Sequence, residues 1–347
     1  MTAPPRIIVL TPVRNEAWIL DRFLAVTSRF ADHIVVADQQ STDESRAIAA
    51  RYPKVTLIDN PSAGFNEAER QLLLLEAARK LVSGPRVLLA LDADEILAAN
   101  GPSTLDWQKM LGAAPGTVLG LERVDLLADE RTVMRHGLWT ALGYVDDGAA
   151  HQPLLIHSTR IPAAKDAPVL VLPGLKVLHY ALVRPSAVAA KSRWYSVLEN
   201  VLGTCANPFK RRARYHDMMD FAGTARIEPV NSAWFAGWES AGIRMRGDRD
   251  EPFYWYDVEV LRLMAQHGER KFWWDDIWQV DWEGLRQAAL ARGVPGLPAA
   301  PIEGPPAPLR GFLRAVDPPY RAQRALKNRF TPRHRRERSR RELPAES

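Results

Sequence analysis

The sequence is poor in the features that mark secreted and membrane-spanning proteins. Its 347 residues include a single cysteine, Cys205, so an intrachain disulfide cannot form. Small secreted domains often depend on disulfides, whereas a reducing compartment leaves cysteine as the free thiol. No stretch approaches the roughly 20 apolar residues of a membrane-spanning helix, and the apolar run near the N-terminus is too short for a signal peptide. We therefore expect a cytoplasmic protein.

Two glycine-rich nucleotide-binding motifs are also missing. The first predicted strand, residues 6–11, continues into "TPVRNEA", which contains no glycine. A dinucleotide-binding fold would place G-x-G-x-x-G at this turn, where the backbone approaches a pyrophosphate. No G-x-x-x-x-G-K-[ST] stretch occurs, which argues against a P-loop NTPase. If phosphates bind this chain, other groups must neutralise their charge.

Positive charge is concentrated at the C-terminal end. The formal net charge is +5, yet residues 321–341 alone hold ten Lys or Arg and one acid. We expect a Pro-rich linker over 294–309 and a basic tail over 310–347 that is disordered at least from Thr331. Such a tail can bind nucleic-acid phosphates or anionic lipid headgroups. No nucleic-acid fold motif accompanies it, so we expect no nucleic-acid partner. Our hypothesis is peripheral attachment to the inner face of the membrane; a solvated tail without a partner is the alternative.

The first hundred residues alternate between strand and helix patterns. Ser41 and Glu44 stand in capping-box register, which predicts that a helix opens there. Strand–helix–strand repeats at this spacing predict a mostly parallel sheet with right-handed crossovers and flanking helices. The predicted strands cover residues 6–11, 33–37, 55–58 and 86–91, and the predicted helices cover residues 19–30, 41–52 and 66–82.

The remainder of the chain has a less regular pattern. Residues 116–124 and 168–182 read as strands and residues 184–202 as a helix. Seven of the eleven tryptophans fall between 234 and 282, and we expect them to pack a core or anchor loops more readily than to stack on sugars. The expected domains are a main domain over 1–205, divided near residue 100 into a nucleotide half and an acceptor half, and a Trp-rich, mainly helical extension over 206–293.

Polar and acidic residues follow all four predicted strands of the first half. Open parallel sheets bind ligands outside the carboxyl ends of their strands, so these four turns predict a polar cleft. The fourth strand ends in Asp92 and Asp94, and a hard divalent cation takes carboxylate oxygens together with substrate phosphates. Each of these acids has a simpler alternative role, as a solvated turn residue or a helix N-cap.

Four motifs in order resemble the family 2 glycosyltransferases of the GT-A fold. "LTPVRNEAWIL" resembles the opening strand and its Pro-x-x-Asn-Glu turn, and "VVADQQSTDES" resembles the second strand with its Asp-x-x-Ser-x-Asp turn. "GFNEAERQ" resembles the helix that presents an arginine to the diphosphate. "LALDADEIL" resembles the Asp-x-Asp strand. The resemblance is specific over residues 6–97, and it is looser over "GLWTALGYVDDGAAHQPLLIHSTRIP" and "VLHYALVRPSAVAAKSRWY".

The resemblance implies a GT-A type, Rossmann-like sheet with a mixed α/β extension on the acceptor side. It also implies inverting transfer of a sugar from a nucleotide-diphosphate donor to a hydroxyl of a glycan or glycolipid acceptor, with Mg²⁺ or Mn²⁺ as cofactor. The implied nucleotide-sugar-binding residues are Pro12, Asn15, Glu16, Asp38, Ser41, Arg70 and Asp92, and the implied metal residues are Asp92, Asp94 and His179.

The resemblance further implies that Asp146 or Asp147 is the general base that takes the proton of the acceptor hydroxyl. Both acids also fit a plain turn, because they precede a glycine in "DDG". His179 fits a buried core histidine as well as a ligand. The sequence departs from the family at Ala37, where many members have a second acid. This departure leaves recognition of the base and ribose open.

Two other functions fit parts of the same pattern. A nucleotidyltransferase shares the sheet and the metal-binding acid pair, but it usually has a Gly-rich loop with Lys or Arg after the first strand. A non-catalytic protein that binds carbohydrate or membrane could keep the fold without turnover. The presence of Asn15, Glu16, Asp92 and Asp94 together favours the transferase.

Overall fold

The computed structural model describes residues 4–62, 66–152, 159–161, 166–216, 225–248, 250–251 and 253–330. These residues form two compact units. The first unit contains the described residues up to Tyr180 together with Ala225–Asp248, and the second contains the remaining ones. Among the described residues, the chain therefore crosses between the units three times. The boundaries of these units differ from the domain boundary predicted at residue 205. The predicted domain boundaries therefore stay a prediction.

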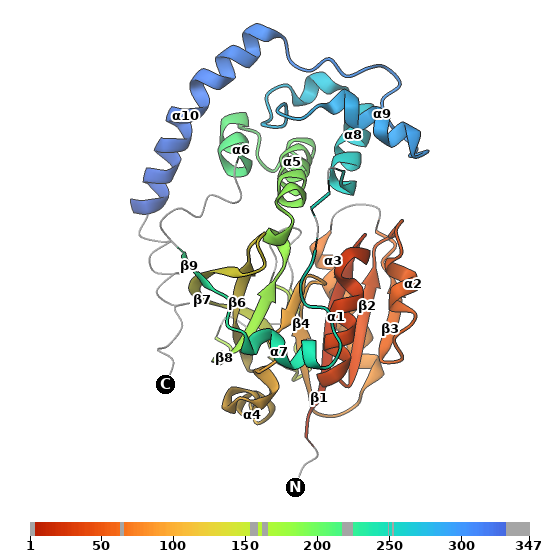
Figure 1. Ribbon diagram of the computed structural model, residues 1–347, viewed down its shortest axis with the longest axis vertical. Helices are drawn as coiled ribbons and strands as arrows, with labels where there is room; N and C mark the ends of the chain where they lie inside the picture. Colours follow the sequence, from red (N-terminus) through yellow and green to blue (C-terminus); the bar gives the residue numbers. More distant parts are fainter. Residues whose placement is uncertain are drawn as a thin grey trace. The chain divides into compact units, whose positions relative to one another are not determined.

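The first unit is built on one mixed sheet (Figure 1). The described strands follow the order β3-β2-β1-β4-β7-β6-β8-β5, and β9 pairs with β7. The first four in this order are mutually parallel, as the sequence predicted. Their bounds are β3 (Val55–Asp59), β2 (His33–Asp38), β1 (Arg6–Val13) and β4 (Arg86–Ala90).

The other half of the sheet changes direction next to β4. Strand β7 runs antiparallel to both β4 and β6, whereas β8 runs parallel to β6 and antiparallel to β5. This pairing brings the end of β8 beside the end of β4 and the acids that follow it. The bounds are β5 (Glu95–Leu97), β6 (Val118–Leu126), β7 (Thr132–Val145), β8 (Val169–His179) and β9 (Arg226–Pro229).

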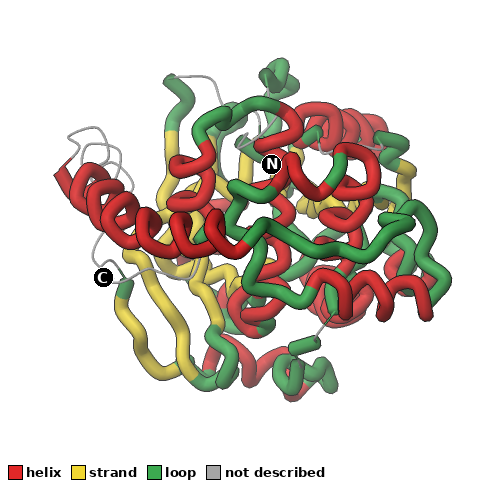
Figure 2. Tube along the Cα trace, turned by 90° about the horizontal axis from the view of Figure 1, so that it is seen from above, coloured by secondary structure: helices red, strands yellow, loops and turns green. Residues whose placement is uncertain are grey.

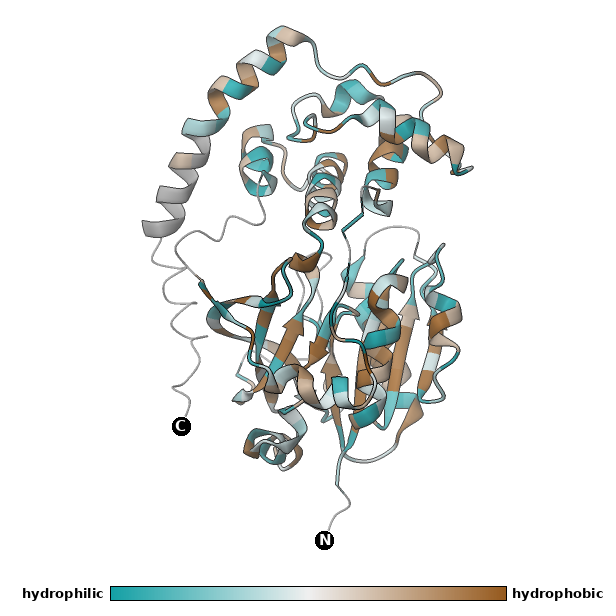
Figure 3. Ribbon diagram, viewed as in Figure 1, coloured by the Kyte–Doolittle hydropathy of each residue, from teal (hydrophilic) through white to brown (hydrophobic). Residues whose placement is uncertain are grey.

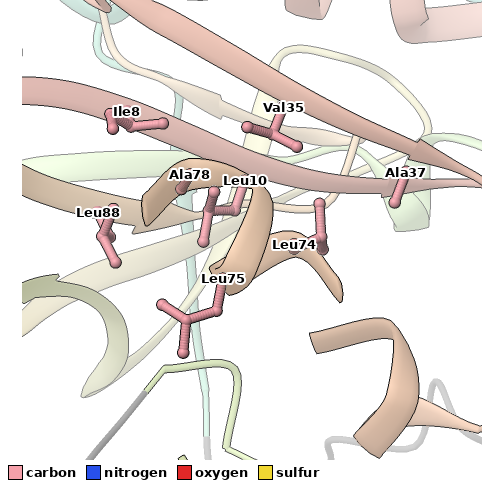
Figure 4. Close-up of a cluster of buried hydrophobic side chains, with 8 residues drawn as sticks. All are labelled: Ile8, Leu10, Val35, Ala37, Leu74, Leu75, Ala78 and Leu88. Carbon is pink, nitrogen blue, oxygen red and sulfur yellow. The ribbon is translucent and has the colours of Figure 1, made fainter. Parts of the chain in front are cut away.

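Helices cover both faces of the parallel strands because successive strand residues point to opposite sides. Helix α3 (Glu67–Leu81) places Leu74, Leu75 and Ala78 on one face, against alternate residues of β1, β2 and β4 (Figure 4). Helix α1 (Ala17–Phe30) contacts β2 and β5 and buries its own apolar stripe. Figure 3 shows the parallel strands as apolar along most of their length, as expected for strands covered by helices on both sides. The mixed α/β fold class is therefore confirmed.

The remaining helices of this unit are short. They are α2 (Ser45–Ala49), η1 (Gly101–Ser103), α4 (Leu105–Leu111) and α7 (Ala233–Ser240). The predicted capping box is wrong, because α2 begins at Ser45 and its N-cap residue, Glu44, makes no side-chain capping bond. The Ser41 hydroxyl instead accepts a hydrogen bond from a different turn, described below. A tertiary contact has replaced the local one.

The second unit is helical within the described residues. Its elements are η2 (Ala181–Val183), α5 (Pro185–Leu202), α6 (Pro208–Tyr215), α8 (Trp255–His267), η3 (Glu269–Phe272), α9 (Trp282–Ala291) and α10 (Ala307–Phe330). Trp194 on α5 packs edge-on against Trp255 on α8, and the Trp282 indole donates to the Ile277 carbonyl. These tryptophans pack the unit internally, as the sequence favoured.

The basic tail predicted over 310–347 is helical up to Phe330, in α10, which is one continuous helix in Figure 2. Its residues Leu313 and Asp317 are buried, and Asp317 accepts a hydrogen bond from Arg212 of α6 at 2.7 Å. The high charge of this segment gave no indication that Leu313 and Asp317 would be buried against the rest of the unit. The disorder predicted from Thr331 falls outside the described residues. No described helix is both long enough and apolar enough to cross a membrane.

Candidate functional site

The turns that follow β1 and β2 are tied together by side chains predicted to bind the donor. The backbone N–H of Asn15 donates to the Ser41 hydroxyl at 2.9 Å, and the Asn15 side-chain oxygen accepts from the N–H of Thr42 at 2.7 Å. Asn15 has a φ of 57°, a left-handed conformation that asparagine adopts more readily than most residues. Glu16 donates its N–H to Ser45 at 2.9 Å. The sequence "RNE" thus forms a fixed connection between two strand ends.

Asp38 is the last residue of β2 and precedes the second of these turns. Its side chain is 1% exposed, and one carboxylate oxygen accepts from Arg46 at 2.9 Å and from the Ser41 N–H at 3.2 Å. The other oxygen is buried and has no hydrogen-bond partner among the residues that the structure describes. Buried carboxylate oxygens are normally satisfied, so this atom is a ready acceptor for a ligand. Pro12 lies beside Asp38, because it pairs with Ala37 in the sheet.

The acids after β4 lie in a different environment from the one predicted. Arg160 donates to the Asp92 carboxylate at 2.7 Å and also binds Glu95, whose side chain is fully buried. Glu95 in turn accepts from the backbone N–H of Asp92 at 3.0 Å. An arginine, rather than an open ligand position, therefore faces Asp92. Burial opposes the charged form of Arg160, but the acids around it raise its pKa overall.

Asp94 faces His179, which ends β8. The two side chains approach to 3.6 Å between His179 Nε2 and a carboxylate oxygen of Asp94. The other ring nitrogen, Nδ1, lies 2.5 Å from Asp125 of β6. Asp125 also lies 3.2 Å from His136 Nε2 on β7. Burial would raise the pKa of Asp125, but hydrogen bonds with the two histidines lower it well below its usual range.

This arrangement resolves which nitrogen of His179 can bind a metal. An ionised Asp125 only accepts hydrogen bonds, so in the neutral imidazole Nδ1 carries the proton and Nε2 presents a lone pair toward Asp94. Two ligands at about 2.1 Å from one ion lie at most about 4.2 Å apart, so the 3.6 Å gap fits a shared cation. No group of three His, Cys, Asp or Glu among the described residues is arranged to hold a metal. The pair fits an ion that a ligand would complete, whereas Asp92 is engaged by Arg160.

Arg70, predicted to offset diphosphate charge, lies in the first turn of α3 and is partly buried. Helix α3 follows β3, so its N-terminal turn opens at the carboxyl edge of the parallel strands. The positive end of the helix dipole lies at the same edge. The structure thus places Arg70 at the edge where Asn15, Asp38 and Asp94 lie.

The expectation that Asp146 or Asp147 is the general base is corrected by the sheet topology. Strand β7 is antiparallel to β4, and the N–H of Asp146 donates to the Arg86 carbonyl at the start of β4. At about 3.3 Å per residue, this lies roughly 20 Å from the acids that follow the strand. The Asp146 side chain is fully buried between Arg79 and Arg86, at 2.7 and 2.6 Å. Asp146 therefore has a structural role, as the shared ion-pair partner of the two arginines.

Asp147 is placed at the same far edge. Its carboxylate accepts from the Tyr144 hydroxyl at 2.6 Å and from the N–H of Ala149 at 2.9 Å. These hydrogen bonds, that of Tyr144 above all, lower the pKa of Asp147. The plain-turn alternative for "DDG" is the one the structure supports.

Three functional candidates were not predicted from the sequence. Asp125 had one available signal, because it is an acid between Val124 and Leu126 in an apolar strand. No sequence signal pointed to Arg160, because its partners Asp92 and Glu95 lie more than sixty residues away in the chain. His136 likewise meets Asp125 only through the pairing of β6 with β7.

Comparisons with known proteins found limited likeness. No protein-family model matches the chain, and no curated protein matches it. Glucosyl-3-phosphoglycerate synthase from Mycobacterium tuberculosis, solved with phosphoglyceric acid, is 18% identical over 35% of this chain and 44% of that one, with a TM-score of 0.27. The same enzyme solved with Mn²⁺, uridine diphosphate and glucosyl-3-phosphoglycerate is 17% identical over the same shares, with a TM-score of 0.26.

A 4-diphosphocytidyl-2C-methyl-D-erythritol synthase is 16% identical over 50% of this chain and 90% of that one, with a TM-score of 0.32. This chain spans less than half the length of the mycobacterial synthase that it matches. At these TM-scores the likeness carries no argument about activity. The function therefore rests on the residues of this chain.

Proposed function

We propose that this protein is a divalent-metal-dependent glycosyltransferase that uses a nucleotide-diphosphate sugar as donor. The observation that carries the proposal is the pair of Asp94 and His179 at the carboxyl edge of the parallel strands. His179 is held by Asp125 in the tautomer that directs a lone pair at Asp94. A buried core histidine would need no such orientation toward a second acid.

The donor's nucleoside would lie over the β1 and β2 turns. The unpartnered oxygen of Asp38 would accept a hydrogen bond from the base or ribose. Asn15 and Ser41 would fix the two turns on either side of it, since they already bind each other. Arg70 and the N-terminal turn of α3 would lie near the diphosphate and offset part of its charge.

Asp94 and His179 would hold the cation, which when bound stabilises the negative charge that develops on the leaving nucleoside diphosphate. Carboxylate oxygens suit Mg²⁺ and Mn²⁺, whereas an imidazole nitrogen favours transition metals over Mg²⁺. We therefore propose that Mn²⁺ binds more tightly than Mg²⁺. Arg160 would keep the charge of Asp92 balanced beside this site.

We propose inverting transfer to a hydroxyl of a cell-surface glycan or a lipid-linked precursor. Inversion requires a single base near the acceptor. Asp146 and Asp147 are not near the strand-end residues, so the base is a different group. A lipid-linked acceptor would bring the protein to the inner face of the membrane, consistent with the ten Lys or Arg between residues 321 and 341.

The test is thermal melting of the full chain with a panel of nucleoside diphosphates and triphosphates, each without metal, with Mn²⁺ and with Mg²⁺. A ligand at a hundred times its Kd stabilises the folded state by about 2.7 kcal/mol. We expect one nucleoside diphosphate to raise Tm in the presence of metal, and Asp94→Ala to abolish the shift. Asp21→Ala is the matched control, because the Asp21 side chain is 61% exposed and contacts Arg51 and Tyr52, neither of which belongs to the proposed site.

The outcomes separate the competing functions. A metal-dependent shift by a diphosphate supports the transferase and identifies the nucleotide. A shift by nucleoside triphosphates but not by diphosphates would favour a nucleotidyltransferase. If no nucleotide shifts Tm with either metal, the glycosyltransferase proposal fails.

A further inference from the structure

The second unit contains a cavity that lies outside the proposed donor site. It has a volume of about 550 Å³ and is formed by α6, the segment after η3, and the first half of α10. Its lining combines charged and apolar side chains. They are Arg212, His216, Asp275, Asp276, Trp278, Gln279, Pro305, Arg310, Leu313, Arg314, Asp317 and Pro318.

The three acids of this cavity are all hydrogen-bonded to protein groups. Asp275 accepts from Arg211 at 2.8 Å and from Asn200 at 2.6 Å. Asp317 accepts from Arg212 at 2.7 Å, and Asp276 accepts from the same guanidinium at 3.1 Å. The negative charges therefore belong to the internal structure of the unit. They leave little attraction for a cation in the cavity.

Two arginines of the lining are in the opposite situation. Arg310 and Arg314 are both exposed, and neither makes a side-chain hydrogen bond or ion pair with any of the described residues. They lie four residues apart on α10, so their side chains leave the same side of the helix. Their charge persists at any physiological pH. Four arginines (Arg211, Arg212, Arg310 and Arg314) against three acids give a formal charge of +1 around the cavity, and the two exposed cations are adjacent guanidinium groups.

The remaining wall is apolar. Trp278 lies with its ring against Gly304, where a Cβ would approach to 3.0 Å, and the buried Leu313 also lines the cavity. A cavity lined by two exposed guanidinium groups and an indole suits an anion attached to an organic group. A phosphate monoester carries a charge of about −1.5 to −2 at pH 7, which matches two arginines better than a monocarboxylate does.

We propose that this cavity binds a phosphate ester, with the phosphate on Arg310 and Arg314 and the organic part against Trp278 and Leu313. The site lies within the second unit and does not depend on the proposed transfer reaction. The phosphate could belong to a soluble metabolite or to a lipid headgroup, since the chemistry recognised is the same.

The experiment measures binding of glucose 1-phosphate and of glucose to the full chain by isothermal titration calorimetry. We expect the phosphate ester to bind and the neutral sugar not to bind. The double variant Arg310→Gln/Arg314→Gln should bind the ester at least about tenfold more weakly, because charge-assisted hydrogen bonds are lost. Arg244→Gln is the matched control, since Arg244 is an exposed arginine outside the cavity.

A second arm identifies the source of the phosphate. Phosphatidylcholine vesicles with and without phosphatidic acid are sedimented with wild type, the double variant and Arg244→Gln. Selective loss of either ester or vesicle binding in the double variant supports the proposal and names the source. If the double variant binds every probe as wild type does, or wild type binds none of them, the proposal is wrong. Ester binding at the donor site would survive both arginine substitutions and count against it.

Discussion

Replacing Asp125 with asparagine tests whether this carboxylate sets the metal-binding state of His179. Asp125 is 4% exposed and interacts with both His179 and His136, at 2.5 and 3.2 Å. Asparagine keeps the size of the side chain but offers only one acceptor oxygen. One histidine would then face an amide group that donates. If that histidine is His179, its Nδ1 must accept, the proton moves to Nε2, and the lone pair toward Asp94 is lost.

The expected magnitude follows from the loss of an oriented ligand. Removing a carboxylate that orients a metal-bound histidine typically weakens metal affinity by about 10–100-fold, or about 1.4–2.7 kcal/mol. The assay is titration of Mn²⁺ into the protein by calorimetry, with the nucleoside diphosphate found in the melting panel present in excess. Asp125→Asn should show this loss while retaining the fold by circular dichroism.

Asp106→Asn is the matched control for burial. Asp106 is 7% exposed and accepts from the N–H of Gly174 at 2.7 Å, but it contacts none of the site residues described above. It should lose stability without losing Mn²⁺ affinity. An Asp125→Asn protein that binds Mn²⁺ within twofold of wild type would refute the orientation argument.

Two further predictions concern the structure around the site. Asp146→Asn should lower the free energy of unfolding by up to about 3 kcal/mol, because it leaves two partly buried arginines without their charge partner, and urea unfolding at pH 7 measures this. Burial would raise the pKa of Asp146, but its hydrogen bonds with the two arginines lower it. The stabilisation by Asp146 is therefore fully present above about pH 3.9 and is lost as the pH falls through the folded-state pKa. An Asp146→Asn protein whose unfolding free energy falls with acid as steeply as that of wild type would contradict this assignment. Asn15→Ala should cost about 1–2 kcal/mol for its left-handed backbone and weaken nucleotide binding, whereas Asn15→Gly should recover the backbone part; equal losses in thermal melting would speak against this reasoning.

The sequence was sufficient to predict the parallel half of the sheet. Strands β1, β2, β3 and β4 lie within one or two residues of their predicted bounds. Continuous apolar runs bounded by polar turns carry this information locally, and parallel order follows from the alternation with helices. For the same reason the sequence correctly placed Asn15, Asp38 and Asp94 at one edge of the sheet.

The other half depended on contacts between distant segments. Nothing in "GYVDDG" shows that β7 runs antiparallel to β4, and this reversal sends Asp146 to the far edge of the sheet. The same pairing of β6, β7 and β8 brings Asp125 to His136 and His179. Strand direction is a property of the whole sheet, so no local pattern of residues encodes it.

The sequence by itself therefore determined which side chains end the parallel strands, because hydrophobic periodicity and turn chemistry are local. Tertiary structure alone decided the charge partners of those side chains. Arg160 faces Asp92, and Asp125 orients His179 toward Asp94, through contacts spanning 54 to 68 residues. An ion pair depends on where a side chain ends in space, and only the folded sheet fixes that position.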